Sequence, residues 1–392
     1  MAEIVVVGSG IIGLGVAYEL ARRGARVTVL DARAAGLGAS QASAGVLAPY
    51  IEAPAPGPLR DLSVESLGLY DEFVARVTSD ARTEVEYRHT GTIDVALDAD
   101  EAERLKATAG VLETLGVRTE WREGADIFRL APAIAPAAVG ALFVPEHALV
   151  SAPGLVRALV RACEAHGVTH RSGARVTKIT RHGDRLSVHI GAGPGPGAGA
   201  DRAAAATETL IADNVVIAAG SWSGQIDTGA APAVPVRPVR GQLLHLAWNP
   251  SITPFEHVLW GARCYMVPWQ DGTVLVGATV EEVGFAEDVT VAGVHTLLSA
   301  AAELVPDTMS ARFKEARVGL RPASSDTVPV IGPSPEMPGL FYATGHYRNG
   351  ILLAPLTAVM LADGILEGRW HRLLDATSPA RFHARDVFRA QA

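Results

Sequence analysis

The sequence predicts a protein of the α/β plus antiparallel β class, in which a unit of parallel strands and helices is joined to a mixed or antiparallel sheet. The first observation is the order of a short apolar strand, a glycine-rich turn, a helix and a second strand at the start of the chain. The second is a set of segments between residues 240 and 320 that alternate apolar and polar residues around an Asp271-Gly272 turn. The third is the return of buried strands that run into glycine turns at residues 214–220 and 340–345, which predicts that the parallel unit is discontinuous.

Length, composition and charge limit the class of protein. The chain has 392 residues, of which 48% are hydrophobic, enough for about two or three domains with large cores. Its formal net charge of −8 and the lack of a Lys/Arg block argue against nucleic acid and anionic membrane surfaces, so small molecules or copies of the chain are the expected partners. No apolar run predicts a membrane span, and the N-terminal apolar stretch lacks the basic start of a signal peptide. Two isolated cysteines, Cys163 and Cys264, predict neither a disulfide framework nor a zinc site and indicate a cytoplasmic protein.

A dinucleotide-binding motif follows the first apolar run. It consists of Gly8, Gly10 and Gly13, with Ile11 and Ile12 before the last glycine. Gly8 permits a tight turn, Gly10 lets the backbone approach a pyrophosphate, and Gly13 lets the helix pack closely on the strand, while the first N–H groups of the helix bind the anion. Asp31 ends the second strand, 18 residues after Gly13, where its carboxylate can accept hydrogen bonds from a ribose. A glycine-rich turn without a ligand is the alternative, and the motif alone does not separate NAD from FAD.

The other elements are predicted from periodicity and turn residues. Helical spacing of apolar residues predicts helices at residues 60–80, 99–115 and 151–167, the last with Ser151 as N-cap. Alternation and turn signals predict strands at residues 87–97 and 173–180. Residues 191–209 are of low complexity and poor in large apolar residues, which predicts a mobile hairpin loop. The lone histidines His89 and His147 are interpreted as hydrogen-bonded structural residues.

The segment after Asp31 favours FAD over NAD. An NAD domain would continue with another helix and parallel strand, whereas residues 36–49 read GLGASQASAGVLAP, small residues that let a large flat ligand lie against the backbone. Without a ligand this stretch is simply an Ala/Ser-rich loop. At this point the chain resembles the amino-acid oxidases of the glutathione-reductase-type FAD fold, within the D-amino-acid oxidase and sarcosine oxidase family, and most closely the glycine oxidases of thiamin biosynthesis.

The resemblance covers essentially the whole chain and implies two domains. A discontinuous FAD-binding Rossmann domain is expected over residues 1–85, 145–232 and 320–392, and a substrate domain over 86–144 and 233–319. FAD is expected to be non-covalent, because residues 317–326 lack the cysteine to which related enzymes attach the cofactor, and no metal is required. Besides the glycine motif and Asp31, the implied cofactor contacts are Ala32, Ala39, Ser40, Ala44, Gly45, Val46, Val176, Ala219, Gly220, His346, Tyr347, Arg348, Asn349, Gly350, Ile351 and Leu352.

The resemblance also implies three catalytic residues, Tyr265, Arg321 and Arg348, which bind the substrate together with Val46. Arg321 is expected to hold the substrate carboxylate, because a guanidinium fork forms two parallel hydrogen bonds that a lysine cannot reproduce. The alternative for Arg321 is a structural ion pair with Asp326 or another acid. Tyr265 is expected to point its hydroxyl at the same substrate, or else to be an ordinary strand aromatic.

Two further features concern the charge of the pocket. In GHYRNGILLAP, residues 345–355, the start of a final helix is expected to face the flavin, because a helix N-terminus favours the negative charge of the reduced ring. Arg348 then reaches the pocket edge; a capped turn with incidental polar residues is the alternative. Arg263, two residues before Tyr265, is expected on the same strand face. It either pairs with a surface acid or recognises an extra carboxylate on a larger N-substituted glycine.

These features predict an FAD-dependent oxidase. The expected reaction converts glycine, or a small N-substituted glycine, to an imine that hydrolyses to glyoxylate, with hydride transfer to flavin N5 and reduction of dioxygen to hydrogen peroxide. A role in thiamin biosynthesis and a homotetramer follow from the resemblance alone. The alternatives are a flavin dehydrogenase that reduces a quinone or carrier, an oxidase of a larger N-carboxyalkyl glycine, and a non-catalytic flavin-binding protein.

Overall fold

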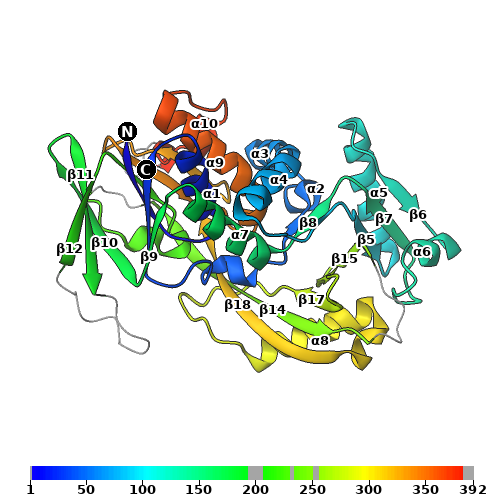
Figure 1. The fold of residues 1–392 in the computed structure, drawn as a ribbon. Helices are drawn as coiled ribbons and strands as arrows, with labels where there is room; N and C mark the ends of the chain where they lie inside the picture. The colour runs from blue at the N-terminus through cyan, green and yellow to red at the C-terminus, as the bar shows by residue number, and fades with distance from the viewer. Residues whose placement is uncertain (1, 193–205, 230–233, 250–255, 383–392) are drawn as a thin grey trace, which may run out of the picture.

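The computed structural model describes residues 2–192, 206–229, 234–249 and 256–382, and Figure 1 shows their arrangement. A helical layer and a parallel sheet form one part of the molecule, and a second, longer sheet lies below it and to its right in this view (Figure 1). The predicted hairpin at residues 191–209 falls mostly outside the described residues. The strands that flank it, β11 (Arg185–Ala192) and β12 (Ala206–Ala212), pair antiparallel.

A six-stranded sheet carries the predicted parallel unit, with strand order β19-β20-β13-β1-β2-β9. All neighbouring strands run parallel except the edge strand β19, which is antiparallel to β20. The strands are β1 (Glu3–Val7), β2 (Arg26–Asp31), β9 (Thr169–Ser172), β13 (Asn214–Ile217), β19 (Val330–Pro333) and β20 (Leu340–Thr344). This sheet confirms the α/β part of the predicted fold class.

Both faces of this sheet are covered, which explains the apolar composition of its strands. Because side chains alternate along a strand, Ile4 and Val6 of β1 pack toward the helices, whereas Val5 and Val7 pack toward the opposite side. The helices are α1 (Ile11–Arg22), α3 (Pro58–Gly68), α4 (Tyr70–Ala81), α7 (Ala152–Ala165) and α9 (Gly350–Glu367). The opposite side packs against a three-stranded sheet of β10 (Ala174–His182), β11 and β12.

The helix predicted at residues 60–80 is two helices, which corrects the sequence prediction. α3 ends at Gly68 and α4 begins at Tyr70, with Leu69 between them. α3 packs on α9 and α4 packs on α7, so the two halves have different partners. The apolar periodicity is almost continuous across the break, and only the tertiary contacts distinguish two helices from one. The N-cap predicted for α7 is confirmed, since the Ser151 side chain accepts a hydrogen bond from the N–H of Gly154.

An eight-stranded sheet forms the second layer, with strand order β18-β14-β17-β16-β15-β5-β7-β6. All neighbours are antiparallel except β15 and β5, so the predicted mixed or antiparallel sheet is confirmed. Its strands are β5 (Thr92–Ala96), β6 (Glu120–Arg122), β7 (Gly140–Val144), β14 (Val236–Ala247), β15 (Val258–Trp260), β16 (Tyr265–Pro268), β17 (Thr273–Gly277) and β18 (Arg312–Ser324). The remaining elements are β3 (Val46–Leu47), β4 (Tyr87–Arg88), β8 (Ala148–Val150), α2 (Pro49–Glu52), α5 (Ala99–Thr114), α6 (Ala125–Leu130), α8 (Val291–Leu304), α10 (Leu374–Thr377) and the 3₁₀ turns η1 (Ala39–Ala42), η2 (Gly220–Gln225) and η3 (Pro306–Ser310).

The two faces of this second sheet have different neighbours. Leu244 of β14 packs in a cluster with residues of α8, whereas the next residue, Leu243, packs on the opposite face with Ala44 of the small-residue loop. That face of the sheet therefore lies against the segment expected to hold a flat cofactor. The domain boundaries stay predictions; β18 continues without a break across residue 320.

α9 is a core helix despite its apolar composition. Its 18 residues are long and apolar enough to cross a membrane by length and composition, but 67% of that window is buried inside the protein. It packs against α1 and α3 among the helices of Figure 1. Burial on most sides accounts for a helix with so few charged residues.

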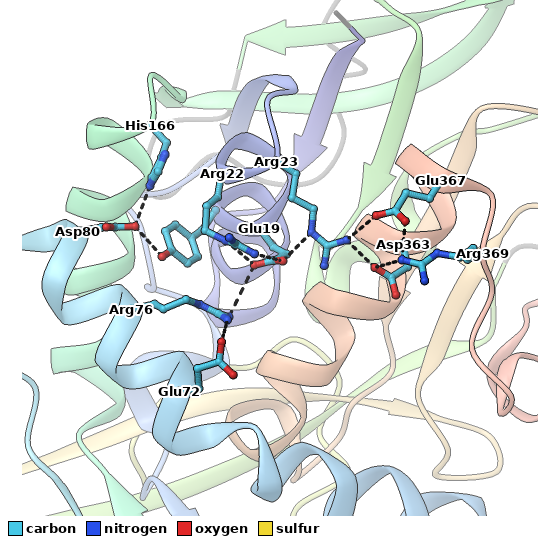
Figure 2. A network of polar contacts seen from close by, with 11 residues as sticks. Glu19, Arg22, Arg23, Glu72, Arg76, Asp80, His166, Asp363, Glu367 and Arg369 are labelled. Carbon is cyan, nitrogen blue, oxygen red and sulfur yellow. Dashed lines mark hydrogen bonds and ion pairs between the residues drawn. The ribbon is translucent and has the colours of Figure 1, made fainter.

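A buried acid on α1 organises the charged groups between the helices (Figure 2). The side chain of Glu19 is only 2% exposed, and its Oε1 accepts hydrogen bonds from Arg22 Nη2 at 2.8 Å and Arg23 Nε at 2.7 Å. Arg23 also donates hydrogen bonds to Asp363 and Glu367 of α9, and Arg76 of α4 lies near the second carboxylate oxygen of Glu19. Burial alone raises the pKa of Glu19, but the hydrogen bonds from the guanidinium groups of Arg22 and Arg23 outweigh it and hold that pKa below its ordinary value. The network therefore ties the first helix of the chain to the last long one.

Candidate active site

One cavity of about 440 Å³ joins the start of α1 to the inner face of the eight-stranded sheet. It contains most of the residues that the sequence assigns to a cofactor. Those that line it are Gly8, Gly10, Ile11, Ile12, Asp31, Ala32, Ala39, Ser40, Ala44, Gly45, Val46, Val176, Ala219, Gly220, His346, Tyr347, Arg348, Gly350 and Ile351. Segments from the beginning, middle and end of the chain thus meet around a single space.

Three of the expected cofactor residues, Gly13, Asn349 and Leu352, do not line the cavity, so their contact with the cofactor stays a prediction. Gly13 is the close-packing position that the motif predicts, because a Cβ there would lie 1.9 Å from the carbonyl oxygen of Gly8. Leu352 is 1% exposed and belongs to the hydrophobic core. Asn349 is the N-cap residue of α9 and is buried, and its Oδ1 accepts no hydrogen bond from the described residues.

The start of α1 is arranged to bind an anion next to a carboxylate. Ser40 Oγ accepts a hydrogen bond from Ile11 N at 3.0 Å, which fixes the small-residue loop against the first turn of the helix. Ser9 donates to Asp31 Oδ2 through its backbone N at 2.6 Å and through its Oγ at 2.8 Å. Arg33 N donates to the other oxygen, Oδ1, at 2.8 Å. Asp31 is therefore held in one orientation at the cavity wall, with lone pairs left for a ribose hydroxyl.

The glycine backbones beside this helix end leave room for a ligand. A Cβ at Gly10 would meet only Ser40 Oγ, at 3.4 Å, and one at Gly220 would meet nothing within 4 Å. Both residues line the cavity. Gly8, by contrast, has a φ of +110°, and a Cβ there would lie 2.3 Å from the carbonyl oxygen of Ala218. The turn can thus be built only with glycine, and an anion-binding helix end, a ribose acceptor and open backbone in one cavity fit FAD.

Arg321 projects from β18 into the far part of the same cavity. Its Nη1 donates to the carbonyl oxygens of Thr279 at 2.9 Å and Arg240 at 3.3 Å. Among the described residues no carboxylate forms an ion pair with it, and burial lowers its pKa. The predicted alternative, a pair with Asp326, is wrong, because Asp326 accepts hydrogen bonds from Arg381 instead. Arg321 is therefore a partly buried cation whose charge is left for a ligand.

Tyr265, at the start of β16, lies beside Arg321. Its ring packs against Trp260, with the ring centroids 4.8 Å apart. Burial raises the pKa of the Tyr265 hydroxyl, and the nearby charge of Arg321 acts in the opposite direction. The phenol consequently keeps its proton in the neutral pH range and can donate a hydrogen bond.

The sequence reasoning missed Glu52, the last residue of α2, which lines the cavity and pairs with Arg348. Arg348 Nε lies 2.8 Å from Glu52 Oε2, and its Nη2 lies 3.1 Å from Oε1. Burial lowers the pKa of Arg348, but the charge of Glu52 outweighs burial and raises it. No motif marks this acid; its position just after the small-residue loop was the only available signal. Glu52, Tyr265, Arg321 and Arg348 are called the arginine cluster below.

Arg263 is not part of the cluster, so its predicted place is wrong. It does not line the cavity, and it forms an exposed ion pair with Glu303, with Nη1 2.7 Å from each carboxylate oxygen. Strand periodicity does not apply to Arg263, because β16 begins only at Tyr265 and residues 261–264 form the turn before it. Of the two roles expected for Arg263, the pair with a surface acid is confirmed.

The histidine at the start of the final segment is neutral. His346 is 2% exposed, its Nε2 lies 3.0 Å from Thr357 Oγ1, and burial lowers its pKa to about 3. It therefore carries no charge near neutral pH, and the positive end of the α9 dipole and Arg348 are the electropositive groups of this segment. His147 is also buried, with Nδ1 2.7 Å from Thr92 Oγ1, and His89 pairs with Asp71 outside the cavity. Both are structural residues, as predicted.

Comparison with known proteins places these features in a family. The family model described as FAD dependent oxidoreductase matches residues 3–364. The bifunctional protein ThiO/ThiG of a Nostoc species is 34% identical over 377 residues, which are 95% of this chain and 54% of that protein. The chain thus spans about half the length of that relative. The glycine oxidase of Geobacillus kaustophilus is 31% identical over 363 residues, 92% of each chain.

Solved structures show the same similarity over nearly the whole fold. The crystal structure of glycine oxidase from Geobacillus kaustophilus superposes with a TM-score of 0.87 at 30% identity, covering 96% of this chain and 98% of the other. The crystal structure of iminodiacetate oxidase from Chelativorans sp. BNC1 superposes with a TM-score of 0.85 at 26% identity, with the same coverage.

Proposed function

The chain belongs to the family of FAD-dependent oxidoreductases, and on that premise we propose that it is an amino-acid oxidase that acts on glycine or a small N-substituted glycine. The amine carbon is oxidised to an imine, which water hydrolyses to glyoxylate and the amine or ammonia. Dioxygen takes the two electrons and becomes hydrogen peroxide. The names of the glycine oxidase relatives support this substrate, and those of the ThiO/ThiG relatives support a role in thiamin biosynthesis.

The observation that carries the proposal is the environment of Arg321. A guanidinium taken out of water is unfavourable unless it is paired, and the described residues offer Arg321 two carbonyl oxygens but no carboxylate. The carboxylate of an amino acid supplies the missing charge with two parallel hydrogen bonds. Because Arg321 shares its cavity with the cofactor residues, an amino acid bound there lies next to the cofactor.

The residues of the cavity bind and orient the substrate rather than move its protons. The isoalloxazine ring of bound FAD supplies the electron-accepting chemistry. Tyr265 donates a hydrogen bond to the substrate that Arg321 holds, which fixes the amine-bearing carbon relative to the cavity wall. The His346 side chain is hydrogen-bonded to Thr357, and Glu52 forms an ion pair with Arg348, so neither is free to act as a base. The substrate therefore reacts with its amine already neutral, and turnover rises with pH as that amine loses its proton.

Anaerobic mixing of the purified flavoprotein with glycine tests the proposal. Loss of the flavin absorbance on mixing, followed by its return and by hydrogen peroxide when air is admitted, is the expected result. A flavin that stays oxidised with glycine and with sarcosine would contradict the assignment of substrate. Bleaching without peroxide on admission of air would favour a dehydrogenase that uses a quinone or carrier.

The remaining expectations are part of the same proposal. We propose that the protein works in the cytoplasm on small molecules and assembles as a homotetramer. An N-carboxyalkyl glycine is a second candidate substrate, favoured by the similarity to iminodiacetate oxidase.

A further inference from the structure

Glu52 places a carboxylate in the cavity that is expected to bind the carboxylate of a substrate. Its side chain is 14% exposed, and both of its oxygens are engaged by Arg348, whose side chain is 33% exposed. The two residues come from distant segments, α2 and the turn before α9, and meet at the cavity. Such a two-point pair between guanidinium and carboxylate is the geometry that Arg348 would otherwise offer to a ligand.

The pair changes the charge that a ligand meets. The arginine cluster contains two cations and one anion, so one positive charge, that of Arg321, remains without an ionic partner among the described residues. Glu52 and Arg348 are close enough to influence the pKa of both Tyr265 and Arg321. The surface cation Arg263 is held by Glu303 and adds nothing to this balance.

We propose that Glu52 is a specificity-determining residue: by occupying Arg348, it makes the cavity select amino acids with one carboxylate over those with two. This inference rests on the proposed function and names its substrate class. A second carboxylate has to displace Glu52 from Arg348, which leaves a partly buried anion unpaired, or has to lie beside Glu52 without a cation of its own. Discrimination of this kind depends on a repulsive group directed against the wrong ligand as much as on contacts with the right one.

The first test measures ligand affinity in the wild-type flavoprotein. Glycolate and diglycolate are carboxylates without an oxidisable amine, and their binding is followed through the perturbation of the flavin absorbance. Wild type is expected to bind glycolate at least tenfold more tightly than diglycolate, a difference of about 1.4 kcal/mol. Tighter binding of diglycolate by wild type overturns the proposal without any substitution.

The second test changes the charge of Glu52. Glu52→Gln is expected to improve diglycolate affinity relative to glycolate at least tenfold, because Arg348 becomes available to the second carboxylate. Glu52→Asp keeps the charge and is expected to keep the wild-type preference. The double variant Glu52→Gln with Arg348→Gln is expected to lose the gain. A ratio of glycolate to diglycolate affinity in Glu52→Gln that stays within twofold of the wild-type ratio overturns the proposal.

A matched control and a second readout separate this inference from the proposed function. Glu303→Gln releases Arg263 from its exposed ion pair, as Glu52→Gln releases Arg348 in the cavity. This control is expected to leave the ratio of glycolate to diglycolate affinity within twofold of wild type. A tenfold gain in relative diglycolate affinity in Glu303→Gln overturns the proposal. Rates of anaerobic bleaching with glycine and iminodiacetate should shift in the same sense as the affinities in Glu52→Gln. If wild type is not bleached by either amine, the proposed function fails, while the glycolate and diglycolate affinities still decide the role of Glu52.

Discussion

At the scale of single residues, two glycines give the arginine cluster its shape. A Cβ at Gly241 would lie 2.3 Å from Arg321 Nη2, and a Cβ at Gly277 would lie 2.4 Å from the Tyr265 hydroxyl. Gly241 belongs to β14 and Gly277 to β17, strands that neighbour each other in the sheet. The side chains of Arg321 and Tyr265 thus lie flat across strand backbones that carry no side chain at these positions.

We predict that Gly241→Ala lowers kcat/KM for glycine about a hundredfold, because the new methyl group pushes the Arg321 guanidinium out of its place and a shift near 1 Å can cost this much. Steady-state kinetics and the flavin content of the purified variant check the prediction. Gly110→Ala is the control, since Gly110 lies on α5 with nothing within 4 Å of its added Cβ. Equal kinetics for Gly241→Ala and wild type would mean that the position of Arg321 is unimportant.

Arg321→Lys is predicted to keep its flavin and to lose about 10²–10³-fold in kcat/KM for glycine, since an ammonium cannot form the two parallel hydrogen bonds of a guanidinium. The flavin spectrum verifies the cofactor, and stopped-flow bleaching gives the rate. A variant that keeps its flavin and turns over at the wild-type rate would show that Arg321 does not bind the substrate.

The sequence was sufficient for residues whose role depends on type and spacing, and insufficient for those whose role depends on tertiary contacts. Gly8, Gly10 and Asp31 follow from a local pattern, and Arg321 and Tyr265 from resemblance; all five line the cavity. Glu52 pairs with a residue 296 positions away, so nothing in its neighbourhood reveals the contact. The misplaced residue, Arg263, was assigned to a strand that starts two residues later.

At the scale of elements, α1 combines a binding function with a structural one. Its N-terminus lines the cavity, and its last turns carry the buried Glu19 network that reaches α4 and α9 (Figure 2). The stability of that network is linked to pH. Since folding lowers the pKa of Glu19 from its ordinary value of 4.5, the charged network contributes its stability above the ordinary value and loses it as the pH falls through the lowered pKa.

Glu19→Gln is therefore predicted to lower the free energy of unfolding by about 3 kcal/mol at pH 7, because Arg22 and Arg23 lose a buried partner. Urea denaturation at several pH values measures the difference between variant and wild type. The difference should shrink as the pH falls below 4.5. A constant difference from pH 7 to pH 3 would show that the charge of Glu19 does not matter.

The elements were predicted where local signals mark both ends. α5 and α7 begin at residues whose side chains cap them, Asp98 and Ser151, and their extents match the predicted ranges closely. The break at Leu69 was missed, because it reflects the packing of α3 and α4 on different helices rather than a Gly or Pro. Packing between distant elements overrides local periodicity in such a case.

At the scale of the whole molecule, the site exists because the chain alternates between the two sheets: separate stretches of sequence contribute strands to one sheet and then to the other. α1 and its glycine turn come from residues near the N-terminus, Tyr265 from the second sheet, and Arg348 from the turn before α9. The fold class was predictable, since parallel and antiparallel segments differ in apolar pattern. The register that sets Arg321 opposite Val239, two residues before Gly241, was not, because a sequence pattern does not fix which residues of two long strands pair.

The most direct test of the central claim is a crystal structure of the flavoprotein with glycolate bound. We predict FAD in the cavity that begins at α1, and a glycolate carboxylate within hydrogen-bonding distance of the Arg321 guanidinium, close to Tyr265. Glycolate bound elsewhere, or an Arg321 side chain turned away from the cavity that holds FAD, would contradict it.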